Sequence, residues 1–124
     1  MAKLVLIEDS KNLALALKGA LELNGHEVIW VSDGREGLIA VKKNKPAAVL
    51  LDLMLPHISG FEICKAIKTD SSIFKTPVII MSTLTSPEDM ERAQNAGADH
   101  FISKPYNLKQ TLAEIFKFIP KQEK

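Results

Sequence analysis

The chain has 124 residues, of which 46% are hydrophobic and 25% charged, and its formal net charge is +1. This balance is ordinary for one globular domain with a sizeable core, and it excludes a basic nucleic-acid-binding surface or an acidic tail. The single cysteine, Cys64, excludes an internal disulfide and fits a reducing compartment. No apolar run reaches the ~18 residues of a membrane span, and the N-terminus has no signal-peptide pattern. We therefore expect a cytoplasmic protein.

Two strand–helix pairs are predicted in the first third of the chain. A strand over residues 3–7 leads into a helix that Asp9 or Ser10 caps. Apolar residues recur there at helical spacing and are expected to face the core: Leu13, Ala16, Leu17, Ala20 and Leu21. A second strand over residues 27–31 precedes a helix that begins after Asp33 and has three apolar residues, Leu38, Ile39 and Val41.

Three further pairs follow. The apolar run 47–51 predicts a strand that is covered on both faces, and Ser59 is a candidate cap for the next helix. A fourth strand over residues 77–81 precedes a helix over residues 87–95, whose apolar residues are few: Met90, Ala93 and Ala96. A short strand over residues 99–103 leads to the last helix, whose apolar side is Leu108, Leu112, Ile115, Phe116 and Ile119.

This alternation predicts a (βα)₅ domain with a doubly wound parallel sheet. Five units suit the flavodoxin-like strand order 2-1-3-4-5. In that order the carboxyl ends of strands 1, 3, 4 and 5 adjoin, so the polar residues that follow them should converge: Glu8, Asp9, Asp52, Ser82, Thr83 and Lys104. Strand 2 lies at the edge of the sheet, and we interpret Asp33 as the cap of its own helix.

The residue types at this edge indicate phosphoryl transfer. Three carboxylates close together need a counter-charge, and oxygen ligands with open positions suit Mg²⁺. Lys104 beside a hydroxyl indicates an anion bound opposite the metal. Asp52 has the central place and is the natural nucleophile for an aspartyl phosphate. Each residue alone has a simpler interpretation as a turn residue, a cap or a surface charge, but their joint placement favours function.

Over essentially its full length the chain resembles the receiver domain of two-component response regulators. The resemblance is carried by Glu8-Asp9, by Asp52 followed by Met54, Pro56 and Gly60, by Ser82 after the fourth strand, and by Lys104-Pro105. It implies that Asp52 accepts a phosphoryl group from a sensor histidine kinase or a phosphotransfer protein. It also implies a cofactor, Mg²⁺, with Mn²⁺ as an alternative.

Further roles follow from the same resemblance. Asp9 and Asp52 would bind the metal directly, the Met54 backbone carbonyl would complete the protein ligands, and Glu8 would help through water. Lys104 would pair with the phosphoryl oxygens, and its bond to Pro105 is expected to be cis.

Ser82 and Phe101 are the implied switch residues. Ser82 would move toward the phosphoryl group, and Phe101, three residues before Lys104, would pack inward behind it. We expect the face formed by the helix over residues 87–95, the fifth strand and the last helix to bind a downstream output protein or domain. A phosphorylation-dependent homodimer is a further expectation, and no direct contact with nucleic acid or membrane is expected.

Three residues depart from the common family pattern. Glu8 replaces an aspartate and is one methylene longer, which changes its reach to the metal. Thr83 stands where a small residue such as alanine is usual and is expected to crowd Ser82. Phe101 lacks the hydroxyl of a tyrosine, so it can pack inward without donating a hydrogen bond.

The lifetime of the phosphoryl group is a separate question. Met54 and Leu84 lie two residues after Asp52 and Ser82, beside the path of hydrolytic water that the resemblance implies. Because both are apolar, we predict slow self-dephosphorylation; the alternative is that they only cover the edge of the core. The chain would catalyse its own phosphorylation and dephosphorylation without being a conventional turnover enzyme.

Rival functions fit the sequence less well. A phosphatase of the haloacid-dehalogenase type needs a second acid two residues after the nucleophile, where Met54 stands. A flavodoxin-like cofactor carrier needs a phosphate-binding loop after the first strand, where Glu8-Asp9 would repel phosphate. A receiver fold that acts as a non-phosphorylated interaction scaffold stays open. We expect the receiver domain to span residues 1–120, with residues 121–124 as a C-terminal tail or the start of a linker.

Overall fold

The computed structural model describes residues 2–83, 86–104 and 107–119, and strands and helices alternate along them. The strands are β1 (Lys3–Ile7), β2 (Glu27–Val31), β3 (Ala48–Asp52), β4 (Val78–Ser82) and β5 (His100–Ser103). The helices are α1 (Lys11–Leu23), α2 (Gly34–Asn44), α3 (Gly60–Lys68), α4 (Pro87–Asn95) and α5 (Leu108–Phe116). All strand pairs are parallel, in the order β2-β1-β3-β4-β5, so the predicted fold is confirmed.

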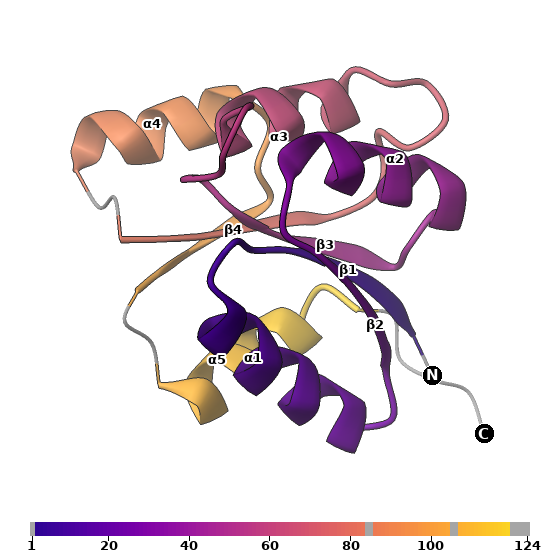
Figure 1. Ribbon diagram of the computed structural model, residues 1–124. Helices are drawn as coiled ribbons and strands as arrows, with labels where there is room; N and C mark the ends of the chain where they lie inside the picture. The colour runs from indigo at the N-terminus through magenta and orange to yellow at the C-terminus, as the bar shows by residue number, and fades with distance from the viewer. Residues whose placement is uncertain (1, 84–85, 105–106, 120–124) are drawn as a thin grey trace.

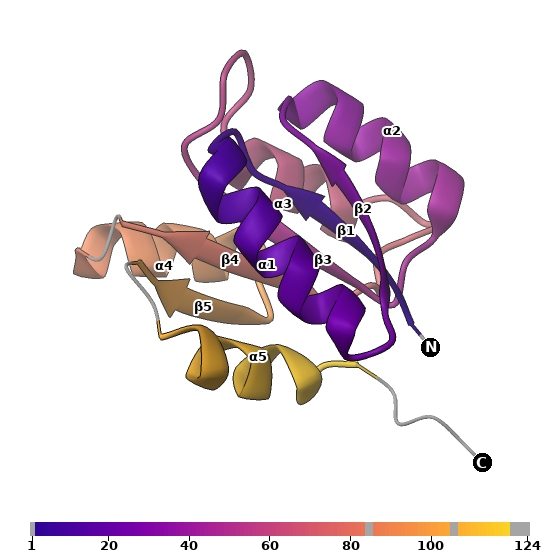
Figure 2. The same cartoon turned by 60° about the horizontal axis from the view of Figure 1, so that its bottom comes forward.

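The sheet is covered by helices on both faces. Figure 1 shows α1 and α5 on one face and α2, α3 and α4 on the other, and Figure 2 shows α5 beside β5. The hydrophobic core consists of two clusters of buried side chains, one on each face of the sheet. Successive residues of a strand alternate between these clusters because their side chains point to opposite faces. In β3, Leu50 packs with the α1 and α5 residues Leu17 and Ile115, whereas Leu51 packs with Ile63 of α3.

Most predicted helix starts are confirmed by their caps. Ser10, rather than Asp9, caps α1 by accepting from the backbone N–H of Leu13 at 3.5 Å. Asp33, Ser59, Ser86 and Asn107 cap the other helices in the same way. Strand bounds shift by about one residue, because β3 and β4 remain paired with their neighbours through Asp52 and Ser82 themselves.

Several residues predicted to face the core do not. In α1, Leu13 and Ala16 are exposed and Ala14 is buried, because Ala14, Leu17 and Leu21 form an alternative stripe, offset from the predicted one, that faces the sheet. Ile39 of α2 is also exposed. Met90 of α4 and Leu108 of α5 are exposed as well, and the only buried residue of α4 is Ala93.

The packing of α2 gives the physical reason for the error at Ile39. This helix approaches the sheet through Gly34, Gly37 and Val41, which are buried. A Cβ atom at Gly37 would lie 2.5 Å from Cδ1 of Ile7 in β1. Because the close approach uses glycines, which have no side chain, counting apolar side chains could not identify the buried face.

None of the helices in the described ranges is long and apolar enough to cross a membrane.

Candidate functional site

Two carboxylates and one ammonium group meet where β1, β3 and β5 end. The Lys104 ammonium nitrogen lies 2.6 Å from Oε1 of Glu8 and 3.6 Å from Oδ1 of Asp52. These side chains are at most 8% exposed. Each of the three charged residues lies two positions after a core residue that packs on the α1 and α5 side of the sheet: Leu6, Leu50 and Ile102. Because side chains two residues apart along a strand point to the same side, the three charged groups come together there.

Asp9 adds a solvent-facing carboxylate to the cluster. Oxygen atoms of Glu8, Asp9 and Asp52 lie within 4.8 Å of one another, and Asp9 is exposed whereas the other two are buried. Mg²⁺ prefers oxygen ligands and keeps several waters, so it needs a few carboxylates beside an open position. This donor set fits Mg²⁺ on both counts.

The electrostatics of Asp52 also favour a cation. Burial and, next in size, the negative charge of Glu8 raise the pKa of Asp52 to about 7, against the opposing effects of Lys104 and the Met54 backbone N–H. The Met54 N–H donates to Oδ1 of Asp52 at 3.3 Å. A single buried lysine thus does not offset the acidic cluster, and a bound divalent cation would stabilise the ionised form of Asp52.

The loop between β3 and α3 is shaped by a close backbone contact. Gly60 donates its N–H to the carbonyl of Leu53 at 2.9 Å, and a Cβ atom at Gly60 would lie 2.4 Å from the carbonyl oxygen of Asp52.

The Met54 residue is 58% exposed, so it does not cover the core. Its predicted influence on hydrolytic water stays a prediction, and Leu84, its predicted companion, lies outside the described residues.

A second contact of the loop between β3 and α3 involves His57, which sequence reasoning did not single out. Its Nδ1 lies 2.8 Å from Oδ2 of Asp33, and its backbone has a positive φ of 73°. Asp33 caps α2 as predicted, accepting from the N–H of Arg35 at 2.7 Å, and it lies outside the acidic cluster. Because the pair joins residues 24 positions apart, no local pattern could have indicated it.

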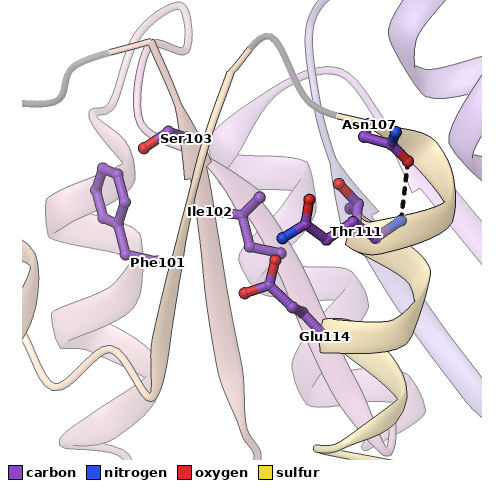
Figure 3. Close-up of a pocket in the computed structure, with 7 residues that line it drawn as sticks. Phe101, Ile102, Ser103, Asn107, Thr111 and Glu114 are labelled. Atoms are coloured by element: carbon purple, nitrogen blue, oxygen red, sulfur yellow. Dashed lines mark hydrogen bonds between the residues drawn. The ribbon is translucent and has the colours of Figure 1, made fainter.

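Phe101 packs on the face of the sheet that α3 and α4 cover, and Ser82 ends the neighbouring strand β4. Ser82 is buried at the end of β4, and its carbonyl accepts from the Lys104 N–H at 2.8 Å. Phe101 pairs in register with Ile80, two residues before Ser82, and packs partly buried against the α3 and α4 cluster. Figure 3 shows Phe101 pointing away from α5 while Ile102 points toward it.

Two further predictions concern the neighbours of these residues. Thr83 is exposed. Its predicted crowding of Ser82 stays a prediction. The expected cis bond involves Pro105, which lies outside the described residues.

Trp30 is the neighbour of the site that sequence reasoning missed. Its indole N–H donates to the backbone carbonyl of Glu8 at 2.8 Å, from the adjacent strand β2. A usable signal was present, because a tryptophan in a half-buried strand needs an acceptor for its N–H. Which acceptor it finds depends on the pairing of β1 with β2.

The fold and site together define a parallel α/β protein with a buried acidic centre and a lysine at the carboxyl ends of its strands. Comparison with known proteins agrees. The response regulator receiver domain family matches residues 4–116. The chain belongs to this family, and it is a receiver domain of two-component response regulators.

Individual relatives support the assignment. The response regulator ArlR of Staphylococcus saprophyticus is 35% identical over 98% of this chain and 54% of the relative. The DNA-binding response regulator MtrA of Mycobacterium tuberculosis is 31% identical over 91% of this chain and 48% of the relative. The chain therefore spans about half the length of these relatives. Among solved structures, the Vibrio cholerae chemotaxis protein CheY4 has a TM-score of 0.90 and 30% identity, covering 96% of this chain and 99% of that chain.

Proposed function

We propose that Asp52 accepts a phosphoryl group from a phosphohistidine of a sensor histidine kinase or a phosphotransfer protein. The observation that carries this proposal is the position of Lys104, whose ammonium lies 3.6 Å from Oδ1 of Asp52 inside an acidic, buried cluster. A buried lysine beside the nucleophile supplies the positive charge that a phosphoryl oxygen needs.

In the transfer, an Asp52 carboxylate oxygen forms a bond to phosphorus as the phosphorus–nitrogen bond of the phosphohistidine breaks. The electron pair of that bond stays on the imidazole. The residues that would hold Mg²⁺ are Asp9, Asp52 and the Met54 carbonyl, with Glu8 acting through water. Bound there, Mg²⁺ would neutralise charge on the transferring group. Asp52 must be ionised to attack, which the neighbouring cations favour.

The output of the reaction is proposed to pass through Ser82 and Phe101 to the face formed by α4, β5 and α5. Phosphorylation adds about −1.5 to −2 charges and three acceptor oxygens, to which the Ser82 hydroxyl can donate. Phe101 borders two hollows on this face. One of about 440 Å³ lies between α4 and β5, and another of about 250 Å³ lies between β5 and α5. Figure 3 shows the second, with Thr111 and Glu114 of α5 facing Ile102.

The test of the phosphoacceptor is incubation with a small phosphodonor and Mg²⁺, followed by intact mass measurement. A gain of one phosphoryl group that disappears in Asp52→Asn is expected. No gain with any donor would favour the alternative function, a receiver-fold scaffold that binds partners without phosphorylation.

The test of the switch is hydrogen exchange of α4 with and without the phosphodonor. A change in the wild type that is lost in Ser82→Ala is expected, and so is loss of phosphorylation-dependent partner binding. An undiminished change in the variant would contradict the coupling through Ser82.

The phosphoryl lifetime is proposed to be long because Met54 and Leu84 offer no hydrogen bond to hydrolytic water. Polar replacement at both positions is expected to accelerate loss of the phosphoryl group, measured as the decay of the phosphorylated mass. Unchanged decay would count against this explanation.

Receivers act between a kinase and an output protein or domain, and MtrA is named a DNA-binding regulator. We propose such an output partner for this chain, a phosphorylation-dependent homodimer and a cytoplasmic location. The proposed domain covers residues 1–120, and the tail or linker proposed for residues 121–124 lies outside the described residues.

A further inference from the structure

Glu8 has a partner at each of its polar atoms. Its N–H donates to the carbonyl of Val31 at 3.1 Å, and its carbonyl accepts from the Trp30 indole at 2.8 Å. Its Oε2 accepts from the Ser10 N–H at 3.1 Å, and its Oε1 accepts from the Lys104 ammonium at 2.6 Å. Because the side chain is only 2% exposed, solvent hardly competes for these contacts. Glu8 is therefore held rigidly from both backbone and side chain.

Lys104 is shared unequally between two buried carboxylates. Its ammonium is 2.6 Å from Glu8 and 3.6 Å from Asp52, and only the shorter distance is a hydrogen bond. Charge attraction and the hydrogen bond both strengthen at short range. In the unmodified protein Lys104 is thus the partner of Glu8, even though Asp52 is the residue proposed to carry the phosphoryl group.

The length of the Glu8 side chain makes this contact. An aspartate is one methylene shorter, about 1.5 Å in reach, and the backbone at this position is fixed by Trp30 and Val31. An aspartate on the same backbone would fall short of the 2.6 Å contact with Lys104. The extra methylene of Glu8 therefore extends its reach toward the lysine.

We propose that Glu8 is a positioning residue that keeps Lys104 back from Asp52 until the phosphoryl group arrives. This inference rests on the proposed function. A phosphoryl group on Asp52 presents three acceptor oxygens and more charge than one carboxylate, so it draws the ammonium away from Glu8. The contact with Glu8 competes with the phosphorylated state, and its strength sets how readily the site accepts a phosphoryl group.

The test compares two affinities in each variant by calorimetry: that for Mg²⁺ alone, and that for beryllofluoride, a phosphoryl analogue, at saturating Mg²⁺. Glu8→Asp keeps the charge but loses the reach, so its analogue affinity should rise about tenfold, or ~1.4 kcal/mol, with little loss of Mg²⁺ affinity. Glu8→Gln removes the charge, so its Mg²⁺ affinity should fall while its analogue affinity rises. A role for Glu8 as a metal ligand alone predicts that the Mg²⁺ affinity falls in Glu8→Gln while the analogue affinity at saturating Mg²⁺ does not rise.

The controls separate this inference from the proposed function. No analogue binding to the wild type, or binding that persists in Asp52→Asn, would overturn both. Wild-type binding that is unchanged or weaker in Glu8→Asp would overturn the inference alone. If circular dichroism shows that Glu8→Asp is unfolded, Glu8→Gln decides by the opposite signs of its two affinities. Glu27→Gln, which changes an exposed acid at the amino end of β2, should leave both affinities unchanged.

Discussion

At the residue scale, the site places an ionisable group where it is costly to ionise. Asp52 is buried at the end of a central strand, and burial together with Glu8 raises its pKa to about 7. The unfolded chain releases the same proton near pH 4. Between these values the folded state binds more protons than the unfolded state, so the free energy of unfolding falls as the pH rises.

Asp52→Asn is therefore expected to stabilise the protein at neutral pH. The amide cannot ionise, so the variant should be more stable than the wild type by roughly 2 to 4 kcal/mol at pH 8. The gain should shrink toward zero below about pH 3, where wild-type Asp52 is protonated in both states. Urea unfolding at several pH values without Mg²⁺ measures this, and a gain independent of pH would contradict it.

Two glycines provide a matched pair of substitutions at the same scale. A Cβ atom at Gly60 would lie 2.4 Å from the Asp52 carbonyl oxygen and 2.6 Å from the Leu53 Cα, which are backbone atoms. At Gly19 in α1, a Cβ atom would meet nothing within 4 Å. Gly60→Ala should destabilise the protein by about 2 kcal/mol or more, whereas Gly19→Ala should stabilise it by about 0.5–1 kcal/mol. Thermal unfolding of both variants gives the comparison, and equal effects would refute the steric argument.

At the element scale, α4 has the fewest buried residues of the helices that the structure describes. Ala93 is its only buried residue, and its remaining contact of note is with α3, where the Arg92 guanidinium lies 4.1 Å from the centre of the Phe61 ring. Such a cation–π contact contributes about 0.5–1 kcal/mol at an exposed site. A helix held by so little can shift between two positions, which is what a switch element needs.

Arg92→Ala is accordingly expected to loosen α4 selectively. Hydrogen exchange of α4 amides should accelerate by about two- to fivefold, the kinetic equivalent of 0.5–1 kcal/mol, while exchange in α1 stays unchanged. The control is Glu91→Ala, which alters the neighbouring exposed residue of the same helix. Equal acceleration in both variants would assign the effect to the loss of a charged side chain from α4 in general instead of the contact with Phe61.

At the scale of the whole molecule, the acidic cluster links metal binding to folding. Glu8, Asp9 and Asp52 come from strand ends that adjoin only in the folded chain. A ligand that binds the folded state alone stabilises it by about 2.7 kcal/mol at a hundredfold excess over its dissociation constant. Cation binding should therefore increase the free energy of unfolding of the whole domain.

Mg²⁺ is expected to raise the Tm by on the order of 10 °C at that excess. Asp9→Asn should lose most of the increase, because Asp9 is the exposed carboxylate of the cluster. Thermal unfolding with NaCl at matched ionic strength separates site binding from general screening. A rise in Tm that survives in Asp9→Asn would show that the cation acts elsewhere.

The sequence by itself determined the fold and the membership of the site. Unbroken apolar runs specify the strands locally and apolar stripes near period 3.6 specify the helices, and their strict alternation leaves few topologies open. The strand order then implies that Glu8, Asp9, Asp52 and Lys104 meet, because parallel strands end at one edge. Caps such as Ser59 were also accessible, since their hydrogen bonds span only three residues.

The tertiary structure alone decided which side chains contact one another. The buried stripe of α1 depended on how the helix lies against the sheet, and α2 approaches β1 through Gly37 while Ile39 faces solvent. The choice of Lys104 between Glu8 and Asp52 depends on distances of 2.6 and 3.6 Å that no pattern encodes. The physical reason is range: local propensities act within a few residues, whereas the partners in this site are up to 96 positions apart.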